Sequence, residues 1–364
     1  MPRRVRLIAV VLLAAIQVSW VHRAALAADS DAPEDMTSTT MNIGKTPFQV
    51  QGFGNVDWIV SPYKGQQSGW ENGAFDLFIT SHLDEHWSVL SELVFEPSGN
   101  EISTDLERFE FVYEYSDAFK IAAGRVHNPF LQWPITYHHG LFMQIPIQRP
   151  IMARWEDEPG LWPMHFVGLL AQGRLFGALG LNYAFGVGNG RGTSLEVVQV
   201  GSDANNNKAI TASLGVSPDA LQGFEVHGST YVDRIPADTT LEENDYAVSS
   251  SFVRGPVDLR GEWSQMQHKD QAHSITYTTQ GWYVLGAYRL PIHGVTLRPY
   301  VLVEGINAPG DETFLGNPAD ETAWAAGGRW DVSRWVALKA QYRSDKIEGI
   351  ERTGEVRAQL AVNF

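Results

Sequence analysis

The sequence predicts an all-β protein, a transmembrane antiparallel β-barrel of about sixteen strands. Polar and apolar residues alternate along most segments, as in 355–364, where Val356, Leu360 and Phe364 share an apolar face. After residue 27 no run approaches 18 apolar residues, so only strands that close into a barrel could cross a membrane. The chain contains 34 glycines, 12 tryptophans, 12 tyrosines and 17 phenylalanines. Such residues suit the turns and the aromatic girdles of a membrane barrel.

Residues 1–27 carry the pattern of a secretory signal peptide. Three arginines precede a mostly apolar run, and Ala25-Leu26-Ala27 is a small-x-small cleavage motif. An uncleaved anchor helix is the alternative, but His22 and Arg23 interrupt the apolar run. We therefore expect the mature chain to begin at Ala28.

The composition excludes several classes of function. Removing residues 1–27 takes away four arginines and no acid, so the formal charge moves from −15 to −19. Such an acidic chain is unsuited to nucleic acid, which needs a basic face. There is no cysteine, so disulfides and thiolate metal sites are excluded. No Gly-x-Ser-x-Gly elbow or phosphate-binding glycine loop is recognisable, and we expect neither catalytic residues nor a cofactor.

A flexible N-terminal lead-in is expected at 28–45, followed by the barrel domain at 46–364. Single-chain bacterial barrels have an even number of strands, short periplasmic turns and longer outer connections. Two of the outer connections are expected at 97–103 and 268–277. The predicted strands are 47–60, 70–82, 85–96, 104–115, 118–126, 163–173, 175–187, 207–217, 223–235, 243–254, 256–267, 278–290, 294–305, 321–331, 334–345 and 353–364.

The connection 127–162 is far longer than any other, and six prolines stiffen it when Pro163 is included. Long loops without secondary structure are usually functional or disordered, and this one is too rich in Trp, Phe, Ile and Leu to be disordered. It must pack on something, so we expect it to fold into the barrel as a constriction loop. Trp133, Trp155 and Trp162 are interpreted as packing anchors, with sugar stacking as the alternative.

Sixteen strands with a long third outer loop resemble the trimeric porins of Gram-negative bacteria, in which that loop narrows the pore. The stretches Gly124 to Pro129, Tyr137 to Gly140 and Met164 to Gly168 resemble a porin-like family related to the phosphate-selective porins. The resemblance implies passive diffusion of small hydrophilic solutes and ions across the outer membrane, and a homotrimer. Phosphate-selective porins line the constriction with basic residues, whereas this loop also carries acids, which argues against phosphate selectivity.

At the constriction we expect acids of the loop to face bases of the last strands across a narrow, wet gap. The resulting field would order water and sort solutes by charge and dipole. Alternatively, Arg154 pairs with Glu158 and pins the loop, and the lumen bases only satisfy inward carboxylates such as Glu110 and Glu114. The predicted constriction residues are Arg149, Arg154, Glu156, Asp157, Glu158, Arg298, Lys339, Arg343 and Arg357.

Four histidines, His127, His138, His139 and His165, fall in or beside the same loop. We interpret them as imidazoles that hydrogen-bond loop carbonyls and lock the fold. A metal site completed by a neighbouring acid is the alternative. No spacing such as His-x3-His supports it, so no metal is predicted.

The acids of the outer loops are expected to favour cations and, as a hypothesis, to bridge to lipopolysaccharide through divalent ions. The lipid of the outer membrane is expected to surround the barrel. A plugged structural or metal-binding barrel and an exported soluble β-sandwich are the alternatives. The acids in question are Asp238, Glu242, Glu243, Asp245, Asp311, Glu312, Asp320 and Glu321.

Overall fold

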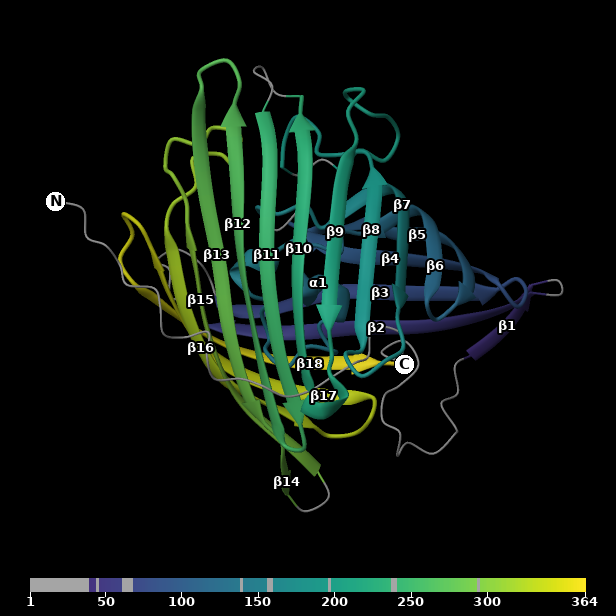
Figure 1. Ribbon diagram of the computed structural model, residues 1–364. Coiled ribbons are helices and arrows are strands. Elements are labelled where there is room, and N and C mark those ends of the chain that lie inside the picture. The colour runs from purple at the N-terminus through teal and green to yellow at the C-terminus, as the bar shows by residue number, and fades with distance from the viewer. Residues whose placement is uncertain are drawn as a thin grey trace.

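The computed structural model describes residues 39–43, 46–60, 68–137, 140–155, 160–195, 198–236, 241–292 and 295–364. Among these residues, sixteen antiparallel strands form one closed ring (Figure 1). Each ring strand pairs with the ring strands before and after it, and β18 (Thr353–Asn363) pairs with β2 (Thr46–Val60) to close the barrel. The predicted fold class and number of strands are therefore confirmed.

Two short strands extend the ring at its rim. β1 (Thr39–Ile43) pairs with the start of β2, and β14 (Leu290–Ile292) pairs with the start of β15. Residues 39–43 belong to the predicted flexible lead-in, so this part of it forms a hairpin instead. The other strands are β3 (Gly69–His82), β4 (Trp87–Ser98), β5 (Glu101–Ser116), β6 (Phe119–His127), β7 (His165–Arg174), β8 (Leu181–Gly188), β9 (Ala209–Val216), β10 (Phe224–Ile235), β11 (Leu241–Arg254), β12 (Val257–Asp270), β13 (Ile275–Tyr288), β15 (Val295–Asn307), β16 (Glu321–Asp331) and β17 (Val336–Ile347).

The outward face of the ring is apolar. Along β18, Val356 and Leu360 are 48% and 42% exposed, whereas Gln359 between them is 3% exposed. Trp282 and Trp324 on β13 and β16 are exposed on the same outward face. A band of exposed apolar and aromatic side chains is what contact with lipid requires of a barrel.

In the part of the chain that the structure describes, the helical elements are α1 (Gln132–Tyr137) and the 3-10 turns η1 (Ile151–Ala153) and η2 (Asp219–Leu221). Among the described residues, no helix is long and apolar enough to span a membrane.

Two predicted outer connections, 97–103 and 268–277, are wrong in length. Only Gly99 and Asn100 separate β4 from β5, and only residues 271–274 separate β12 from β13. The strands continue past their predicted ends because their backbones remain paired beyond the span that a membrane needs. Gly99 adopts a φ of 64° and Ser274 a φ of 56°, the left-handed conformation that such tight turns use.

Gly124 marks a close approach between β5 and β6. Its φ is 137°, and a Cβ atom added there would lie 1.9 Å from the carbonyl oxygen of Phe109. Only glycine tolerates both the conformation and the contact. Gly228 on β10 has open space around its Cα, which makes it a matched position for comparison.

Replacing Gly124 with alanine should therefore lower the free energy of unfolding by about 1–3 kcal/mol, because the new methyl group meets backbone and cannot be accommodated by a side-chain movement. Urea unfolding in detergent micelles, followed by tryptophan fluorescence, measures the change. Gly228→Ala should leave the midpoint close to that of the wild type. Equal midpoints for the two variants would contradict this account.

Candidate functional site

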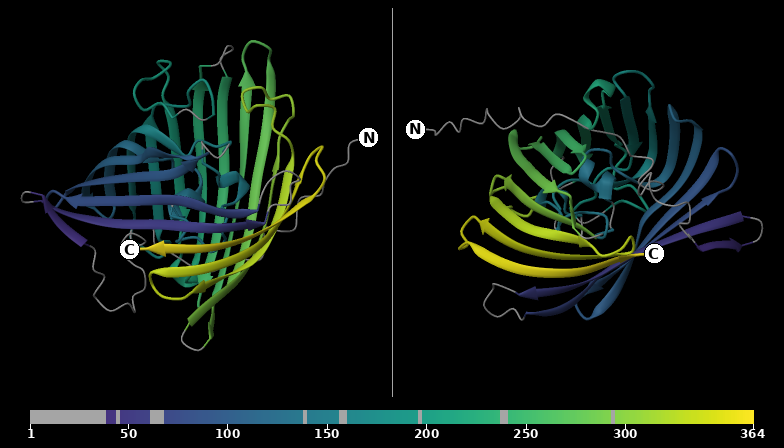
Figure 2. Two further views of the ribbon diagram at one scale, coloured as in Figure 1. Left: turned by 180° about the vertical axis from the view of Figure 1, so that it is seen from behind. Right: turned by 90° about the horizontal axis from the view of Figure 1, so that it is seen from below.

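Residues 128–164, here called the inner segment, connect β6 to β7 and are described except for 138–139 and 156–159. The view along the barrel in Figure 2 shows α1 and its flanking chain within the ring of strands. Buried apolar residues of the segment form one cluster with inward-facing residues of β9 to β16. The segment contributes Phe130, Leu131, Trp133, Tyr137, Ile145, Ile151, Met152, Ala153, Trp155, Leu161, Trp162 and Met164 to this cluster.

The barrel wall beneath the inner segment is apolar or small, although porin lumens are polar in general. Leu285 on β13, Leu302 on β15 and Ala325 on β16 are fully buried inner positions of that wall. Gly281 on β13 leaves room for the ring of Trp162, to which an added Cβ would come within 2.6 Å. The wall is thus shaped to receive the segment rather than to face water.

The three tryptophans predicted as packing anchors are all buried. Trp133, Trp155 and Trp162 are 2%, 3% and 0% exposed. Side chains so enclosed pack the segment against the wall and leave little ring surface for a solute.

Glu262 on β12 holds the beginning of α1. Its two carboxylate oxygens accept the backbone N–H groups of Gln132 and Trp133, each at 2.8 Å, and the hydroxyl of Tyr283 donates to it at 2.7 Å. These N–H groups start a helix and have no partner within it. The barrel therefore supplies the cap that the segment's own sequence lacks.

The same arrangement recurs along the rest of the segment. Glu304 on β15 accepts the N–H of Ile151 at 2.5 Å. Lys339 on β17 donates to the carbonyl oxygens of Leu141 and Pro146 at 2.5 and 3.2 Å. Arg329 on β16 donates to the carbonyl oxygens of Phe142 and Gln144. Because buried backbone groups must be paired, these side chains determine where the segment lies.

The two ends of the inner segment are joined to each other. His127 and His165 are cross-strand partners at the end of β6 and the start of β7. Asn128 donates from its backbone to Met164 at 2.8 Å and from its side chain to Pro163 at 3.0 Å. The segment thus leaves and rejoins the barrel at one point.

His127 and His165 also form an aromatic group with Trp155. The His165 ring stacks on Trp155 at a centroid distance of 5.1 Å and lies 4.9 Å from the His127 ring. Glu107 lies 3.2 Å from Nε2 of His165. These contacts are with aromatic rings and a carboxylate, so the predicted hydrogen bonds to loop carbonyl oxygens stay a prediction. His138 and His139 lie outside the described residues, and no metal-binding group of three or more His, Asp or Glu occurs within them.

Four of the predicted constriction residues meet at one cavity of about 210 Å³. Arg149 and Arg154 reach it from the inner segment, and Arg343 and Arg357 reach it from β17 and β18. Asp57 on β2 is the one acid among the residues that line it. The predicted convergence of loop and barrel therefore occurs, with guanidinium groups on both sides.

The two strand arginines of this cavity, Arg343 and Arg357, form ion pairs with neighbouring carboxylates. Arg343 pairs with Glu304 at 2.5 Å and Asp345 at 2.7 Å. Arg357 contacts Glu355 at 3.0 Å and Asp57 at 3.4 Å. These pairs orient the guanidinium groups, which also form part of the cavity wall.

Arg154 pairs with an acid of the barrel wall. Its guanidinium lies 3.1 Å from Glu321 on β16. Glu158, with Glu156 and Asp157, lies outside the described residues, so the predicted acidic side of the constriction stays a prediction. The Arg149 guanidinium lies 5.0 Å from the ring centre of Trp155.

Two predicted constriction bases do not line the cavity. Lys339 is 3% exposed and holds the inner segment, and Arg298 pairs with Asp331 at 2.9 Å near the start of β15. The sequence predicted that both side chains face the lumen, but each one binds a partner within the protein. The charge of these two residues is therefore structural.

The expected acidic outer surface also needs correction. Glu243, Asp245 and Glu312 are 0–1% exposed, and Glu243 pairs with Arg191 at 2.7 Å. Glu243 and Asp245 face inward because side chains alternate along β11, and residues 243 and 245 lie on its lumen side. Asp238 lies outside the described residues.

Apart from Lys339, the strand residues that hold the inner segment were not identified from the sequence. Glu262, Glu304 and Arg329 occupy inward positions on strands whose other inward residues include leucine and alanine. A single charge on an otherwise apolar inner face is the signal that could have identified them, because a buried charge requires a specific partner.

No protein-family profile and no curated protein matches the sequence. Solved structures do resemble the fold. An anion-selective porin from Comamonas acidovorans aligns with a TM-score of 0.62 at 14% identity, over 88% of this chain and 100% of that chain. Salmonella typhi OmpF in complex with daunomycin aligns with a TM-score of 0.61 at 12% identity, over 89% and 100%. A trimer form of OmpT, an outer membrane protein of Vibrio cholerae, aligns with a TM-score of 0.58 at 8% identity, over 88% and 99%.

This chain therefore has the fold of outer-membrane porins. The predicted localisation in the outer membrane agrees with the outer-membrane proteins of this fold and with the apolar outward face.

Substituting Glu262 with alanine should release α1 from the wall, because it leaves two buried N–H groups and one hydroxyl without an acceptor. The loss should amount to about 2–4 kcal/mol of local stability. Hydrogen exchange of the Gln132 and Trp133 amides measures it, with at least a roughly tenfold acceleration expected. Glu262→Gln keeps one acceptor oxygen, so its amide exchange rates should fall between those of the wild type and Glu262→Ala. Unchanged exchange in both variants would refute the capping role.

Proposed function

We propose that this chain is an outer-membrane porin through which small hydrophilic solutes and ions diffuse passively. The inner segment narrows the path, and solutes are sorted there by size and charge. The observation that carries the proposal is the arginine-lined cavity, to which both the inner segment and the barrel wall contribute. The porin fold of solved structures supports it at the level of architecture.

The physical basis of the sorting is electrostatic. Guanidinium groups held in a narrow space bounded by low-dielectric walls create a field that acts on any charged or dipolar solute. Here Arg149, Arg154, Arg343 and Arg357 surround one small volume. If Glu156, Asp157 and Glu158 lie opposite, the field runs across the path. Without them, the cavity favours anions despite the acidic charge of the whole chain.

A plugged barrel is the second candidate, and one observation favours it. The inner segment is packed against the wall through twelve buried apolar residues, with Trp162 completely enclosed. A segment so well fixed could close the lumen instead of narrowing it. Such a barrel would serve a structural role without conductance.

The processing and assembly of the chain are part of the same proposal. Residues 1–27 are removed as a signal peptide, and the mature chain begins at Ala28. A homotrimer is supported by the trimer form of one structure with this fold. Mass spectrometry of outer-membrane fractions would test the cleavage site.

Single-channel recording of the refolded mature chain in a planar bilayer tests the channel function. We expect stepwise conductance, because the water-filled part of a sixteen-stranded lumen should pass hydrated ions. Heat-modifiable gel mobility establishes in the same sample that the protein is folded. Folded and inserted protein without conductance would reject the porin proposal and favour the plugged barrel.

The double variant Arg149→Gln, Arg154→Gln should shift the reversal potential under a salt gradient toward cation selectivity. Removing two positive charges from the cavity lowers the local concentration of anions, and the effect should weaken at high salt. Arg254→Gln at the end of β11, away from the cavity, provides a charge-matched control. An identical shift in the control would mean that net charge, rather than the cavity, sets selectivity.

A further inference from the structure

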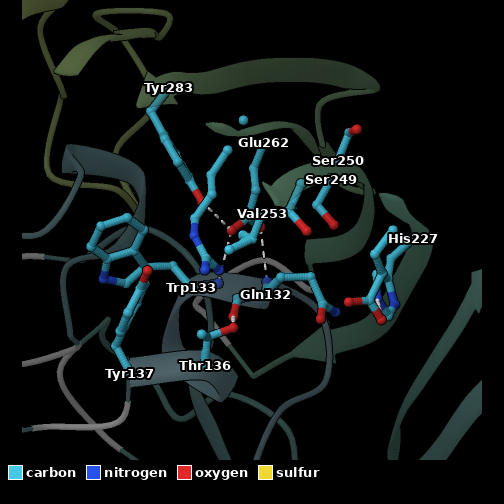
Figure 3. Close-up of a pocket in the computed structure, with 14 residues that line it drawn as sticks. Gln132, Trp133, Thr136, Tyr137, His227, Ser249, Ser250, Val253, Glu262 and Tyr283 are labelled. Atoms are coloured by element: carbon cyan, nitrogen blue, oxygen red, sulfur yellow. Dashed lines mark hydrogen bonds and ion pairs between the residues drawn. The ribbon is translucent and has the colours of Figure 1, made fainter. Parts of the chain in front are cut away.

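A second cavity of about 180 Å³ lies between α1 and the walls of β10 to β13 (Figure 3). The inner segment contributes Gln132, Trp133, Thr136 and Tyr137 to its lining. Pockets for drug-sized molecules begin at about 300 Å³, so this space suits a smaller solute. It shares no lining residue with the arginine-lined cavity and is therefore a separate place on the proposed path.

The charged groups that line this cavity are already paired. Glu262 accepts two backbone N–H groups and the Tyr283 hydroxyl. Arg260 pairs with Asp258 at 2.8 Å, and its guanidinium lies 5.3 Å from the Tyr137 ring centre.

The third charged group, Glu225, also has hydrogen-bond partners within the protein. It accepts from Nε2 of His227 at 2.8 Å and from Asn182 at 3.3 Å. Each charged side chain of the described lining is therefore already hydrogen-bonded or ion-paired to groups of the protein.

The uncharged polar groups of the lining have hydrogen-bonding capacity to spare. The side chains of Gln132, Ser249 and Ser251 line the cavity and have no hydrogen-bond partner among the described residues. An amide and two hydroxyls both donate and accept, so together they match groups that do the same. Ser249 comes from β11 and Gln132 from α1, so the groups reach the cavity from different elements (Figure 3).

Aromatic rings complete the wall. Trp133, Tyr137 and Tyr283 are largely enclosed, and the small part of each ring that lines the cavity provides apolar contact for C–H groups. Burial raises the pKa of Tyr137 to about 12, so its phenol stays neutral. Spare donors and acceptors beside aromatic edges are complementary to a molecule with many hydroxyl groups on a small carbon frame.

We propose that this cavity is a binding subsite for a neutral polyhydroxylated solute of monosaccharide size or smaller. The proposal rests on the porin function above and names a solute class for it. Affinity is expected in the millimolar range, because a diffusion channel must release what it binds.

Saturation-transfer NMR with D-glucose and the protein in detergent micelles tests binding without requiring conductance. Glucosamine and glucuronate, of similar size but opposite charge, are the comparison probes. Glucose should bind at least about fivefold more tightly than either, because a charged group would lose hydration in a cavity whose own charged side chains are already engaged by protein partners. Tighter binding of a charged analogue, or no glucose signal, would overturn the proposal.

The variants Gln132→Leu and Ser249→Ala with Ser251→Ala remove the spare hydrogen-bonding groups while keeping similar volume. Each should weaken glucose binding about tenfold or more, the loss expected for one or two hydrogen bonds. Ser91→Ala on the outward side of β4 is the matched control and should bind as the wild type does. Unchanged binding in the cavity variants would reject this site.

Current recordings separate this proposal from the porin function. Transient reduction of ion current by glucose in an open channel, absent in the cavity variants, would support both. Conductance without any response to glucose, together with no NMR signal, would reject the subsite and retain the porin. Glucose binding by a folded barrel that never conducts would reject the porin function and leave a binding barrel.

Discussion

The structure depends on one constraint: the backbone of the inner segment must find its hydrogen-bond partners on the barrel wall. The segment has six prolines and its described residues form little helix, so only some of its N–H and C=O groups are paired within it. Glu262, Glu304, Arg329 and Lys339 provide those partners from four different strands. Their positions determine both the path of the segment and the space that remains beside it.

This constraint divides the inward charges into two groups. Lys339 and Arg343 lie on the same face of β17, four residues apart, but only Arg343 lines the arginine-lined cavity. Lys339 is directed at two backbone carbonyl oxygens. The position of the Lys339 ammonium group is therefore set by the backbone of the segment, whereas the Arg343 guanidinium also reaches the cavity. Under the proposed function, the field in the lumen comes from the arginines at the cavity surface.

The two cavities differ in chemistry because they lie beside different parts of the inner segment. The first is bounded by residues 141–154 and by strands β2, β17 and β18, and it is rich in arginine. The second lies beside α1. There, Glu262 accepts the N–H groups at the start of α1, and Arg260 forms an ion pair with Asp258. A solute on the proposed path would therefore meet one wall rich in arginine and another whose charged side chains are already engaged by protein partners. The charge of the solute would therefore act at the first cavity, and its hydrogen-bonding groups would act at the second.

The sequence by itself determined the barrel, its sixteen strands and the special nature of residues 127–162. Period-two alternation and chain length are local properties, so strand faces and most strand limits follow from neighbouring residues. Turn lengths at 99–100 and 271–274 were missed because backbone pairing extends beyond the membrane-facing pattern.

Tertiary structure decided what each inward side chain touches. Arg154 meets Glu321, which lies 167 residues further along the chain, and no spacing rule connects them. Parity placed Arg298, Lys339, Arg343 and Arg357 on the lumen side, but the inner segment selects which of them stay at a cavity. Hydrogen bonding is short-ranged and directional, so these roles are settled only when the segment is folded against the wall.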